Sequence, residues 1–287
     1  MRIAMLTPAP SYGSDFNWAF DIQAEALRAA GAEVTGEPWT EFEGPAGYDL
    51  VLPLVAWGYH QRHAEWLTFL DRAEAEGWPM VNPPRLLWWN SDKAYLAELG
   101  RKGIASVPTL EVDHLNEAAL AAAHGVLGAD EVVIKPPVSA GAWGTYRLNA
   151  GQPVPEDVHG KRMLVQPWLG AVVEEGEYSL ILFGGRFSHC VAKRPKAGDY
   201  RVQPDHGGTT EPAELPEGAL ALAEAALAAA PAPATYARVD LIRGNDGALR
   251  LMEMELIEPA LFLQCAPDAK ARFAEAILAT VASPQSS

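Results

Sequence analysis

The residues of this 287-residue chain that most suggest chemistry lie near its C-terminus, in the segments ARVDLIRGNDG and RLMEMELIEP. The Asp-Gly pair between the segments is typical of a two-residue β-hairpin turn. Such a turn places Asp240 opposite Glu253 and Arg238 opposite Glu255. Because side chains alternate between the two faces of a strand, these four residues would share one face. The other face would be a packing surface, made of Val239, Leu241, Met252, Met254 and Leu256.

The acids on this hairpin need a source of positive charge. Glu253 and Glu255 would lie ~7 Å apart along their strand, where two carboxylates repel by ~2–3 kcal/mol at an effective dielectric constant of ~20. A divalent cation would turn that repulsion into binding, and oxygen ligands favour Mg²⁺ or Mn²⁺ over zinc. Asp240, Glu253 and Glu255 are therefore candidate metal ligands. The alternative is a solvated polar face on a half-exposed strand, and the hairpin alone does not decide between the two.

Three features upstream of the hairpin add a lysine, a small-residue segment and a strand that contains a proline. Lys135 ends the apolar segment EVVIKPP, so its ammonium group either reaches water along the strand or enters a cleft. Backbone N–H groups of the small-residue segment Ser139–Tyr146 could face phosphate oxygens, although an ordinary flexible turn fits this segment equally well. The strand Met163–Leu169 contains a proline near its end, which indicates an edge or a connecting strand.

Taken in order, these features resemble the ATP-grasp superfamily of carboxylate–amine or carboxylate–thiol ligases. The order is Lys93, VIKP, the small-residue loop, QPWL, the acids that follow it, Lys193, Arg201, ARVD and MEMEL. The chain is similar to D-alanine–D-alanine ligases, glutathione synthetases and ribosomal-protein-modification ligases. VAWGYH, VNPPRLLWWNSDKAYL, GEYSLILFGGRFSHCVAK and ELIEP are most similar to the group that contains the cyclo-ligase of D-cycloserine biosynthesis. The resemblance extends from Arg2 to about Phe262.

The resemblance implies roles for individual residues. Lysines would contact the phosphates of ATP, the loop at residues 139–145 would cover them, QPWL would form the adenine hinge through backbone groups, and one of three acids after it would hold the ribose. The implied ATP-binding residues are Lys93, Lys135, Ser139, Gly141, Gly144, Gln166, Pro167, Trp168, Leu169, Glu174 or Glu175 or Glu177, and Lys193. The implied catalytic residues are Arg238, Lys193 and Arg201, and the implied Mg²⁺ ligands are Asp240, Glu253 and Glu255.

One position departs from the family pattern. Many relatives have Asn where this chain has Glu255, so the number and geometry of the metal ions stay open. Glu258 falls outside the alternation of acids, and it would either meet the incoming amine or cap the turn at Pro259.

The implied function is an ATP- and Mg²⁺-dependent ligase. It would activate a carboxylate as an acyl phosphate, with ADP formed, for attack by an amine that is either a second molecule or part of the same one. The implied partners are a small-molecule carboxylate and amine, and homodimers are common among such enzymes. Arg201 and His206 are candidate contacts for an acidic substrate group, although a flexible loop explains that segment as well. The alternative is a nucleotide-binding regulatory relative without turnover.

Other enzyme classes lack their motifs. The segment TPAPSYGSDF after the first strand has no G-x-G-x-x-G, as a dinucleotide-binding oxidoreductase requires, and the Gly-Lys pair at Gly160 is not part of a P-loop. The G-x-S-x-G of serine hydrolases is also missing. His60 and His63 have no evident third metal ligand. A surface or substrate-side role therefore suits them better, and the resemblance implies that Trp57, Tyr59 and His60 lie near the cleft.

The net charge, the cysteine spacing and the N-terminal segment limit the function classes and the cellular compartment. The formal net charge of −15 argues against non-specific nucleic-acid binding. Cys190 and Cys265 have no paired-ligand spacing, so we expect neither a disulfide framework nor a cysteine zinc site. The N-terminal apolar run breaks at Pro8, too early for a signal peptide. We therefore expect a cytoplasmic protein that does not associate with membranes.

The elements that position these residues change in character along the chain. The first ~85 residues alternate strands and helices, which indicates a small doubly wound unit. The expected strands there are Arg2–Thr7, Asp49–Val55 and Met80–Pro83, and the expected helices are Phe16–Gly31 and His63–Gly77. After a break near Pro84–Asn90 and a helix at Ser91–Gly103, strands joined by turns predominate, with helices at Leu215–Ala230 and Asp268–Ala282.

The predicted fold class is thus α/β in front and α+β behind. It corresponds to an ATP-grasp fold with an N-terminal doubly wound lobe at residues 1–90, a small ATP-covering lobe at 91–166 and a C-terminal antiparallel-sheet lobe at 167–287.

Overall fold

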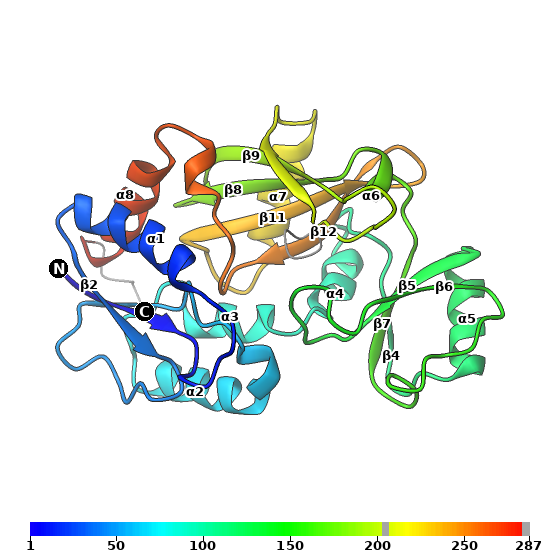
Figure 1. Ribbon diagram of the computed structural model, residues 1–287, viewed down its shortest axis with the longest axis horizontal. Coiled ribbons are helices and arrows are strands. Elements are labelled where there is room, and N and C mark those ends of the chain that lie inside the picture. The colour runs from blue at the N-terminus through cyan, green and yellow to red at the C-terminus, as the bar shows by residue number, and fades with distance from the viewer. Residues whose placement is uncertain (203–206, 283–287) are drawn as a thin grey trace.

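The computed structural model describes residues 1–202 and 207–282. The N-terminal lobe has a parallel sheet in the order β2-β1-β3 (Figure 1). Its strand β1 is buried from Ile3 to Thr7, as the apolar sequence predicts. The elements of this lobe are β1 (Arg2–Thr7), α1 (Asn17–Ala29), β2 (Glu33–Pro38), β3 (Leu50–Leu52), the 3₁₀ helix η1 (Tyr59–Arg62), α2 (His63–Ala75) and α3 (Pro84–Asn90).

A second, four-stranded antiparallel sheet has the order β4-β7-β5-β6. Helix α5 packs on it, and its N-terminus is capped by the side chain of Asn116, which accepts a hydrogen bond from the Ala119 N–H at 2.9 Å. The elements here are β4 (Leu110–Val112), α5 (Glu117–Leu127), β5 (Glu131–Lys135), β6 (Tyr146–Asn149) and β7 (Met163–Pro167).

The third sheet is antiparallel and has the order β10-β9-β8-β11-β12. It carries the hairpin singled out from the sequence, in β11 and β12. The elements of this part are α4 (Tyr95–Arg101), α6 (Ala171–Glu174), β8 (Glu177–Phe183), β9 (Arg186–Arg194), β10 (Thr209–Pro212), α7 (Ala219–Ala228), β11 (Tyr236–Arg243), β12 (Leu249–Glu255), the 3₁₀ helix η3 (Leu263–Cys265) and α8 (Ala269–Ala282).

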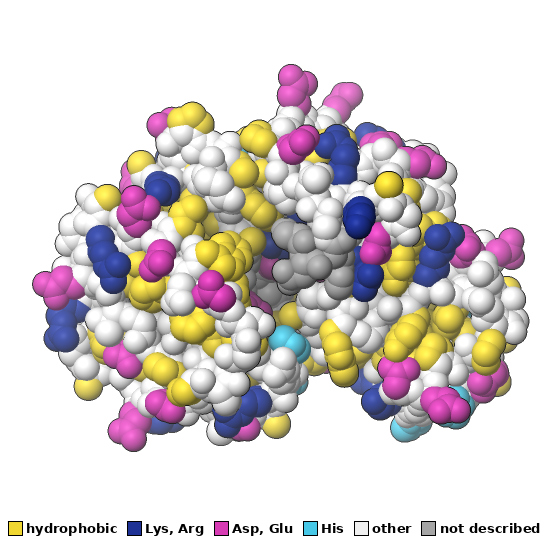
Figure 2. Space-filling view, in the orientation of Figure 1, with side chains coloured by type: hydrophobic (Ala, Val, Ile, Leu, Met, Phe, Trp, Pro, Cys, Tyr) yellow, Lys and Arg dark blue, Asp and Glu magenta, His cyan; other side chains and the backbone are white. Residues whose placement is uncertain are grey.

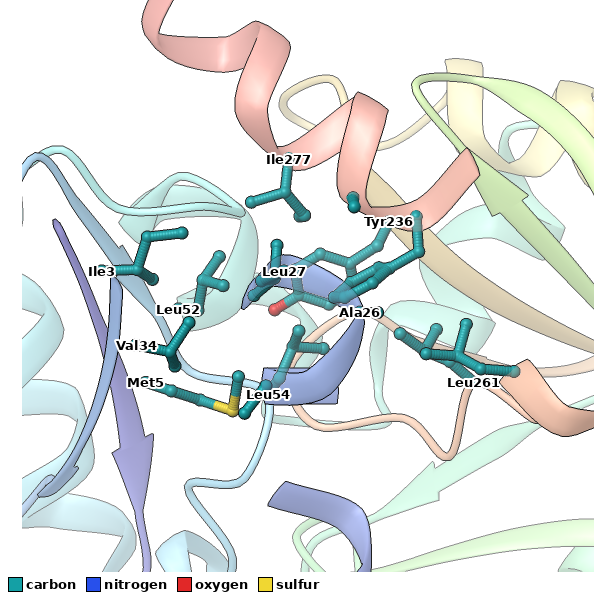
Figure 3. Close-up of a cluster of buried hydrophobic side chains, with 14 of the residues drawn as sticks. Ile3, Met5, Ala26, Leu27, Val34, Leu52, Leu54, Tyr236, Leu261 and Ile277 are labelled. Atoms are coloured by element: carbon teal, nitrogen blue, oxygen red, sulfur yellow. The ribbon is translucent and has the colours of Figure 1, made fainter. Parts of the chain in front are cut away.

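The two ends of the chain pack together. Helix α8 lies beside α1 (Figure 1), and Ile277 belongs to the same buried cluster as Ile3 and Leu27 (Figure 3). Tyr236 from β11 joins that cluster and donates a hydrogen bond to the Ile257 carbonyl at 2.8 Å. The N-terminal lobe is therefore fixed to the sheet that carries the hairpin.

The alternation of α/β in front and antiparallel strands behind is confirmed, but four local expectations differ. Met80 makes only an isolated bridge to Val51 in place of a strand. The expected break is helix α3, which starts at Pro84 because proline suits the first helical turn. The helix expected from Ser91 begins only at Tyr95. Strands β2, β4 and β10 and helices α5 and α6 are additional elements.

The lobe boundaries at residues 90 and 166 stay a prediction. Helix α4 lies within the range expected for the small lobe, yet Tyr95, Leu96 and Leu99 pack into the core under the five-stranded sheet. Among residues 1–202 and 207–282, every helix is too short or too polar to cross a lipid bilayer.

Candidate active site

The hairpin has the predicted register at the site but not the predicted turn. Arg238 pairs with Glu255 and Asp240 with Glu253. The turn, however, is closed by a Gly244 N–H to Ala248 carbonyl hydrogen bond of 2.8 Å, which leaves a three-residue loop. Such loops end in a left-handed residue, and Gly247 has a φ of 81°. A β-bulge after Asp240 compensates for the difference, so two deviations cancel at the site.

Because of the bulge, one residue of the predicted packing face is wrong. Leu251, not Met252, pairs with Leu241 and enters the core under the sheet. Met252 packs instead with Ile242 and Trp168 near the expected hinge. The inserted residue reverses the alternation, since side chains switch faces with period two.

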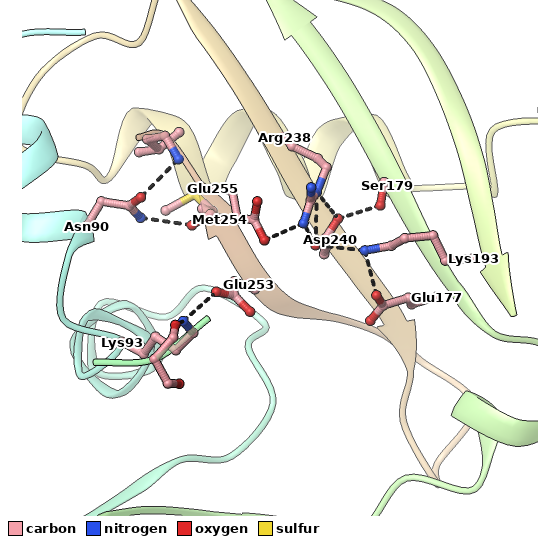
Figure 4. A network of polar contacts seen from close by, with 12 residues as sticks. Asn90, Lys93, Glu177, Ser179, Lys193, Arg238, Asp240, Glu253, Met254 and Glu255 are labelled. Atoms are coloured by element: carbon pink, nitrogen blue, oxygen red, sulfur yellow. Dashed lines mark hydrogen bonds and ion pairs between the residues drawn. The ribbon is translucent and has the colours of Figure 1, made fainter. Parts of the chain in front are cut away.

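Asp240 is the centre of the polar network on the hairpin (Figure 4). It is 3% exposed and accepts hydrogen bonds from Ser179 Oγ at 2.5 Å, Lys193 Nζ at 3.1 Å and Arg238 Nη2 at 3.0 Å. Burial opposes the ionisation of Asp240, but Arg238 and Lys193 outweigh it and hold the pKa of this carboxyl below its usual range. Asp240 is therefore a carboxylate that orients two cations.

Lys193 on β9 joins Asp240 to Glu177 on β8, whose carboxylate lies 2.6 Å from Lys193 Nζ. Burial raises the pKa of Glu177, although Lys193 opposes the rise. The preceding residue must be glycine, because a Cβ on Gly176 would lie 2.2 Å from the Lys193 carbonyl oxygen. This close approach brings β8 and β9 together next to the site.

Two more lysines approach the second strand of the hairpin. Lys93 Nζ lies 3.0 Å from Glu253 Oε1 and donates to the Ser139 carbonyl at 2.6 Å. Lys135, at the end of β5, is 8% exposed and has no carboxylate within ion-pair distance among the residues that the structure describes. Burial lowers the pKa of Lys135. Although burial opposes ionisation of Glu253, Lys93 and Lys135 hold its pKa below the usual value.

The far end of β12 carries excess negative charge. Glu255 forms an ion pair with Arg238 (Figure 4), yet burial, Glu253 and Asp240 raise the pKa of Glu255 to about 7. Burial and Glu255 also hold the pKa of Glu258 well above its usual value. Lys93 and Arg238 do not fully neutralise these acids, so this end of the site would gain from another cation.

The acids fit a metal that arrives with a polyphosphate better than a metal held by protein alone. Within residues 1–202 and 207–282, no three Asp, Glu, His or Cys side chains converge as a metal site would require. Asp240, Glu253 and Glu255 are instead spread along the hairpin: Asp240 and Glu255 share Arg238, and Glu253 pairs with Lys93. Proteins commonly hold Mg²⁺ through one or two carboxylates, with phosphate and water oxygens as the other ligands.

The expected hinge borders an apolar cluster, here called the hinge cluster. Its buried members are Val107, Val172, Val202 and Ile242, with Trp168, Leu169, Ala171, Tyr200 and Met252 packed around them. Trp168 already uses both backbone groups: its N–H donates to the Glu131 carbonyl at 2.9 Å, and its carbonyl accepts from Asn245 Nδ2 at 3.0 Å. Gln166 is buried, and its amide donates to Thr109 at 2.8 Å. The cluster supplies apolar and aromatic side chains of the kind that a base packs against.

The small-residue loop has the backbone that its glycines predict. Gly141 and Gly144 have φ values of 61° and 68°, in the left-handed region. Ser139 is buried beneath the loop, whereas the Trp143 side chain is 67% exposed. The Lys93 contact to the Ser139 carbonyl ties the start of the loop to the acidic hairpin.

Other predicted residues lie outside the polar network around Asp240. Glu174 is exposed at the end of α6, and Glu175 is bound by Arg243 at 3.1 Å. Arg201 pairs with Asp199 at 2.8 Å and makes no ion pair with the hairpin acids of the described chain. His206 lies outside the described residues. His63 contacts Ser91 Oγ at 2.9 Å, so the two-histidine metal pair gains no support.

Two buried asparagines that sequence reasoning missed hold the hairpin in place. Asn90 Nδ2 donates to the Met254 carbonyl, and Asn90 Oδ1 accepts from the Leu256 N–H, both at 2.9 Å. Asn82 donates to the Tyr236 and Leu256 carbonyls, again at 2.9 Å. The available signal was an asparagine inside each of the apolar segments MVNPP and LLWWNS, because buried amides need partners.

Comparison with known proteins agrees with this geometry. The crystal structure of D-cycloserine synthetase DcsG superposes with a TM-score of 0.78 at 29% identity, over 98% of this chain and 100% of that one. A D-alanine–D-alanine ligase from Bacillus anthracis shares the fold, with a TM-score of 0.70 at 19% identity over 98% and 97% of the two chains. The three sheets and the lysine-rich, acidic centre correspond to the fold of an ATP-grasp ligase.

The sequence comparisons narrow this class. Residues 3–82 match the family model described as the N-terminal domain of D-cycloserine synthetase DcsG. The cycloserine biosynthesis protein DcsG of Streptomyces lavendulae is 31% identical over 304 aligned positions, which cover 96% of this chain and 97% of that protein. The chain therefore belongs to the DcsG family of ATP-grasp carboxylate–amine ligases, and the resemblance found in the sequence is confirmed.

Proposed function

We propose that the protein uses ATP and Mg²⁺, or Mn²⁺ in its place, to couple a small carboxylate to an amine, with release of ADP. The observation that carries the proposal is the convergence of Lys93, Lys135 and Lys193 on the acidic face of the β11–β12 hairpin. A cluster of cations facing carboxylates suits a polyphosphate with its metal. The relative's name refers to D-cycloserine, so a cyclising reaction belongs to this proposal as well as the joining of two molecules.

ATP would supply the phosphoryl group that converts the carboxylate into an acyl phosphate, and the metal would neutralise charge on that group. The protein's own task is to hold the reacting groups and offset their charge. Lys135 is the residue best placed for this, because its buried ammonium has no carboxylate partner among the described residues. Lys93 is tied both to Glu253 and to the loop that follows Lys135, so it would link phosphate binding to the metal acids.

Arg238 would stabilise the negative charge that develops on the carbonyl oxygen. Three nitrogen–oxygen contacts of 3.0–3.2 Å to Asp240 fix its guanidinium group. A group held in advance needs no rearrangement when charge develops, which is how fixed donors accelerate such reactions. Asp240, oriented by Ser179, would thus position Arg238 and Lys193 in addition to binding the metal.

The remaining residues would bind the nucleotide and exclude water. The hinge cluster would receive the adenine base beside Gln166, Pro167, Trp168 and Leu169. Glu177 is a better ribose candidate than Glu174 because it lies within the polar network, whereas Glu174 is exposed. The loop that contains Ser139, Gly141 and Gly144 would close over the phosphates, since water would otherwise hydrolyse an acyl phosphate. Arg201, Asp240, Glu253 and Glu255 keep their proposed catalytic and metal roles.

An ADP-release screen tests the function. Purified protein with ATP and Mg²⁺ is assayed against a matrix of amino acids and small amines, each alone and in pairs. The expected result is ADP formation that depends on one acid and one amine, or on a single molecule that contains both. Tight ATP binding without ADP release from any combination would favour the regulatory alternative and contradict the ligase.

A further inference from the structure

A cavity of about 180 Å³ lies between α1 and the segment that follows β12. Its walls include Trp18, Ile22 and Trp57 from the N-terminal lobe, with Leu261 and Phe262 opposite. Hydrophobic side chains gather on this face of the molecule beside the central hollow (Figure 2). None of the described residues that line the cavity carries a charge, which separates it clearly from the acidic hairpin.

Two buried polar atoms of the cavity wall lack partners. Gln23 is 3% exposed, and its Oε1 has no hydrogen-bond donor in the described part of the chain. The same holds for Thr210 Oγ1 on β10. Leaving such an atom unpaired in the folded protein costs roughly 1–3 kcal/mol. Both atoms are covered by protein in this structure, so a ligand in the cavity would supply the missing bonds only after the two side chains turn toward it. Because Gln23 Oε1 can only accept, the ligand should donate an N–H or O–H.

The cavity is one side chain away from the proposed reaction centre. Phe262 lines it, and the guanidinium carbon of Arg238 lies 5.8 Å from the centroid of the Phe262 ring. Thr210 pairs directly with Lys193 across β9 and β10, so their side chains share a face of the sheet. A ligand in the cavity therefore reaches toward Arg238 and Lys193 without contacting the acids.

Size and charge define the group that the cavity can take. Cavities of ~150 Å³ with aliphatic and aromatic walls hold a benzene ring, so this one admits a side chain as large as that of leucine or phenylalanine. A buried carboxylate or phosphate is disfavoured, because none of the described residues of the wall is a cation that would offset its burial. The apolar part of a hydrogen-bond-donating substrate fits.

We infer that this cavity selects the amine substrate, and that this substrate is an amino acid or related amine with an apolar side chain of the size of leucine or phenylalanine. Its side chain would occupy the space between Trp57 and Leu261, and its amino group would donate to Gln23 or Thr210 on the way to the carbonyl. The inference rests on the proposed ligase function and specifies its substrate class.

Two variants and one control test it. Ala260→Phe fills the cavity from a half-buried loop position, and Gln23→Leu removes the acceptor at nearly constant shape. Ala29→Phe adds the same ring at an exposed position of α1 outside the cavity. Each protein is assayed for ADP release with leucine, phenylalanine, alanine, serine and aspartate as amines. Calorimetry with leucine and phenylalanine, in the presence of a non-hydrolysable ATP analogue, measures binding without turnover.

The expected result is that leucine or phenylalanine has the lowest KM, which Ala260→Phe and Gln23→Leu raise by about tenfold while ATP binding and the Ala29→Phe protein stay unchanged. Turnover of small polar amines with a KM that neither cavity variant alters would overturn the inference and leave the ligase proposal intact. Calorimetric binding of the apolar amines without ADP release in any assay would support the cavity and contradict the ligase.

Discussion

The acidic hairpin and the neighbouring cavity differ in charge and in how their polar atoms are paired. In the hairpin, Asp240 is buried among cations that it orients, and Glu253 and Glu255 each form an ion pair with a cation. In the cavity, the described walls carry no charge, and Gln23 Oε1 and Thr210 Oγ1 have no hydrogen-bond partner in the described part of the chain. Phe262 lies between the two regions, since it lines the cavity and its ring faces Arg238.

This difference suggests that chemistry and substrate choice are separable in this fold. The paired charges of the hairpin can stay in place for one type of reaction. The uncharged cavity wall can change shape, and so change the substrate, without disturbing those charges. Variants of the hairpin should therefore affect every substrate equally, and variants of the cavity should affect only some. The predictions below test this separation, starting with the largest effect.

Glu253→Gln should lower kcat by roughly 10²–10³-fold for every substrate, the loss typical of removing one electrostatic contact to developing charge. The change keeps the shape of the side chain but removes the negative charge that pairs with Lys93 and would hold the metal. ADP release at several Mg²⁺ concentrations measures it. Glu224→Gln, on the exposed face of α7, is the matched control. Unchanged turnover in Glu253→Gln would remove the metal role from the hairpin.

Arg238→Met should destabilise the protein by about 3–5 kcal/mol, because it leaves buried Asp240 and half-buried Glu255 without their shared cation. Urea unfolding followed by circular dichroism gives the free energy of unfolding. Arg243→Met breaks an ion pair with Glu175 whose side chains are both 37% exposed, and it should cost less than about 1 kcal/mol. Equal losses in the two variants would show that the hairpin network is no more than a surface feature.

Lys135→Met should weaken ATP binding without lowering the stability of the free protein. Removing a buried ammonium without a described partner should leave the free protein as stable or more so, since burial disfavours the charge. ATP affinity should fall by about 10- to 100-fold, as expected for the loss of a charged hydrogen bond of ~1.5–3 kcal/mol. Calorimetry with ATP and a thermal melt without it are the two measurements. Exposed Lys161→Met provides the control, and an unaltered ATP affinity in Lys135→Met would contradict the account.

His189, which contacts the cavity-lining residue Leu261, should make the free energy of unfolding depend slightly on pH. Its Nε2 donates to the Leu261 carbonyl at 3.1 Å, and burial, helped by Arg272, lowers the pKa of this histidine below its usual value. The unfolded chain then binds a proton that the folded protein does not, so the free energy of unfolding should fall as pH drops below ~6.5.

Urea unfolding at a series of pH values checks this, with His189→Gln expected to show a shallower fall than the wild type. His114→Gln, at an exposed position, should keep the wild-type slope. Identical slopes in all three proteins would show that His189 does not titrate differently in the folded and unfolded states.

The sequence predicted the charged region far better than the uncharged one, for a physical reason. Acids alternating with apolar residues at Glu253 and Glu255 constrain which face a strand presents, and lysines at strand ends are visible one by one. The bulge after Asp240 was invisible, because no residue type specifies it. Its effect on Met252 and the hinge cluster could not be anticipated for the same reason.

The supports and the cavity arise from tertiary packing. Asn90 and Leu256 are far apart in the sequence and meet only when α3 packs against β12. Gln23 and Thr210 are likewise far apart in the sequence. Local patterns carry no information about such pairs, so they emerged only from the folded arrangement.

The most direct test of the central claim follows an oxygen atom from the carboxylate. Once a productive acid and amine are found, the acid is labelled with heavy oxygen in its carboxyl group, and the phosphate released with ADP is analysed by mass spectrometry. If the carboxylate attacks the terminal phosphate of ATP and the amine then displaces phosphate, one labelled oxygen enters inorganic phosphate in each turnover. Unlabelled phosphate, or the label in AMP, would contradict an acyl phosphate formed at this hairpin.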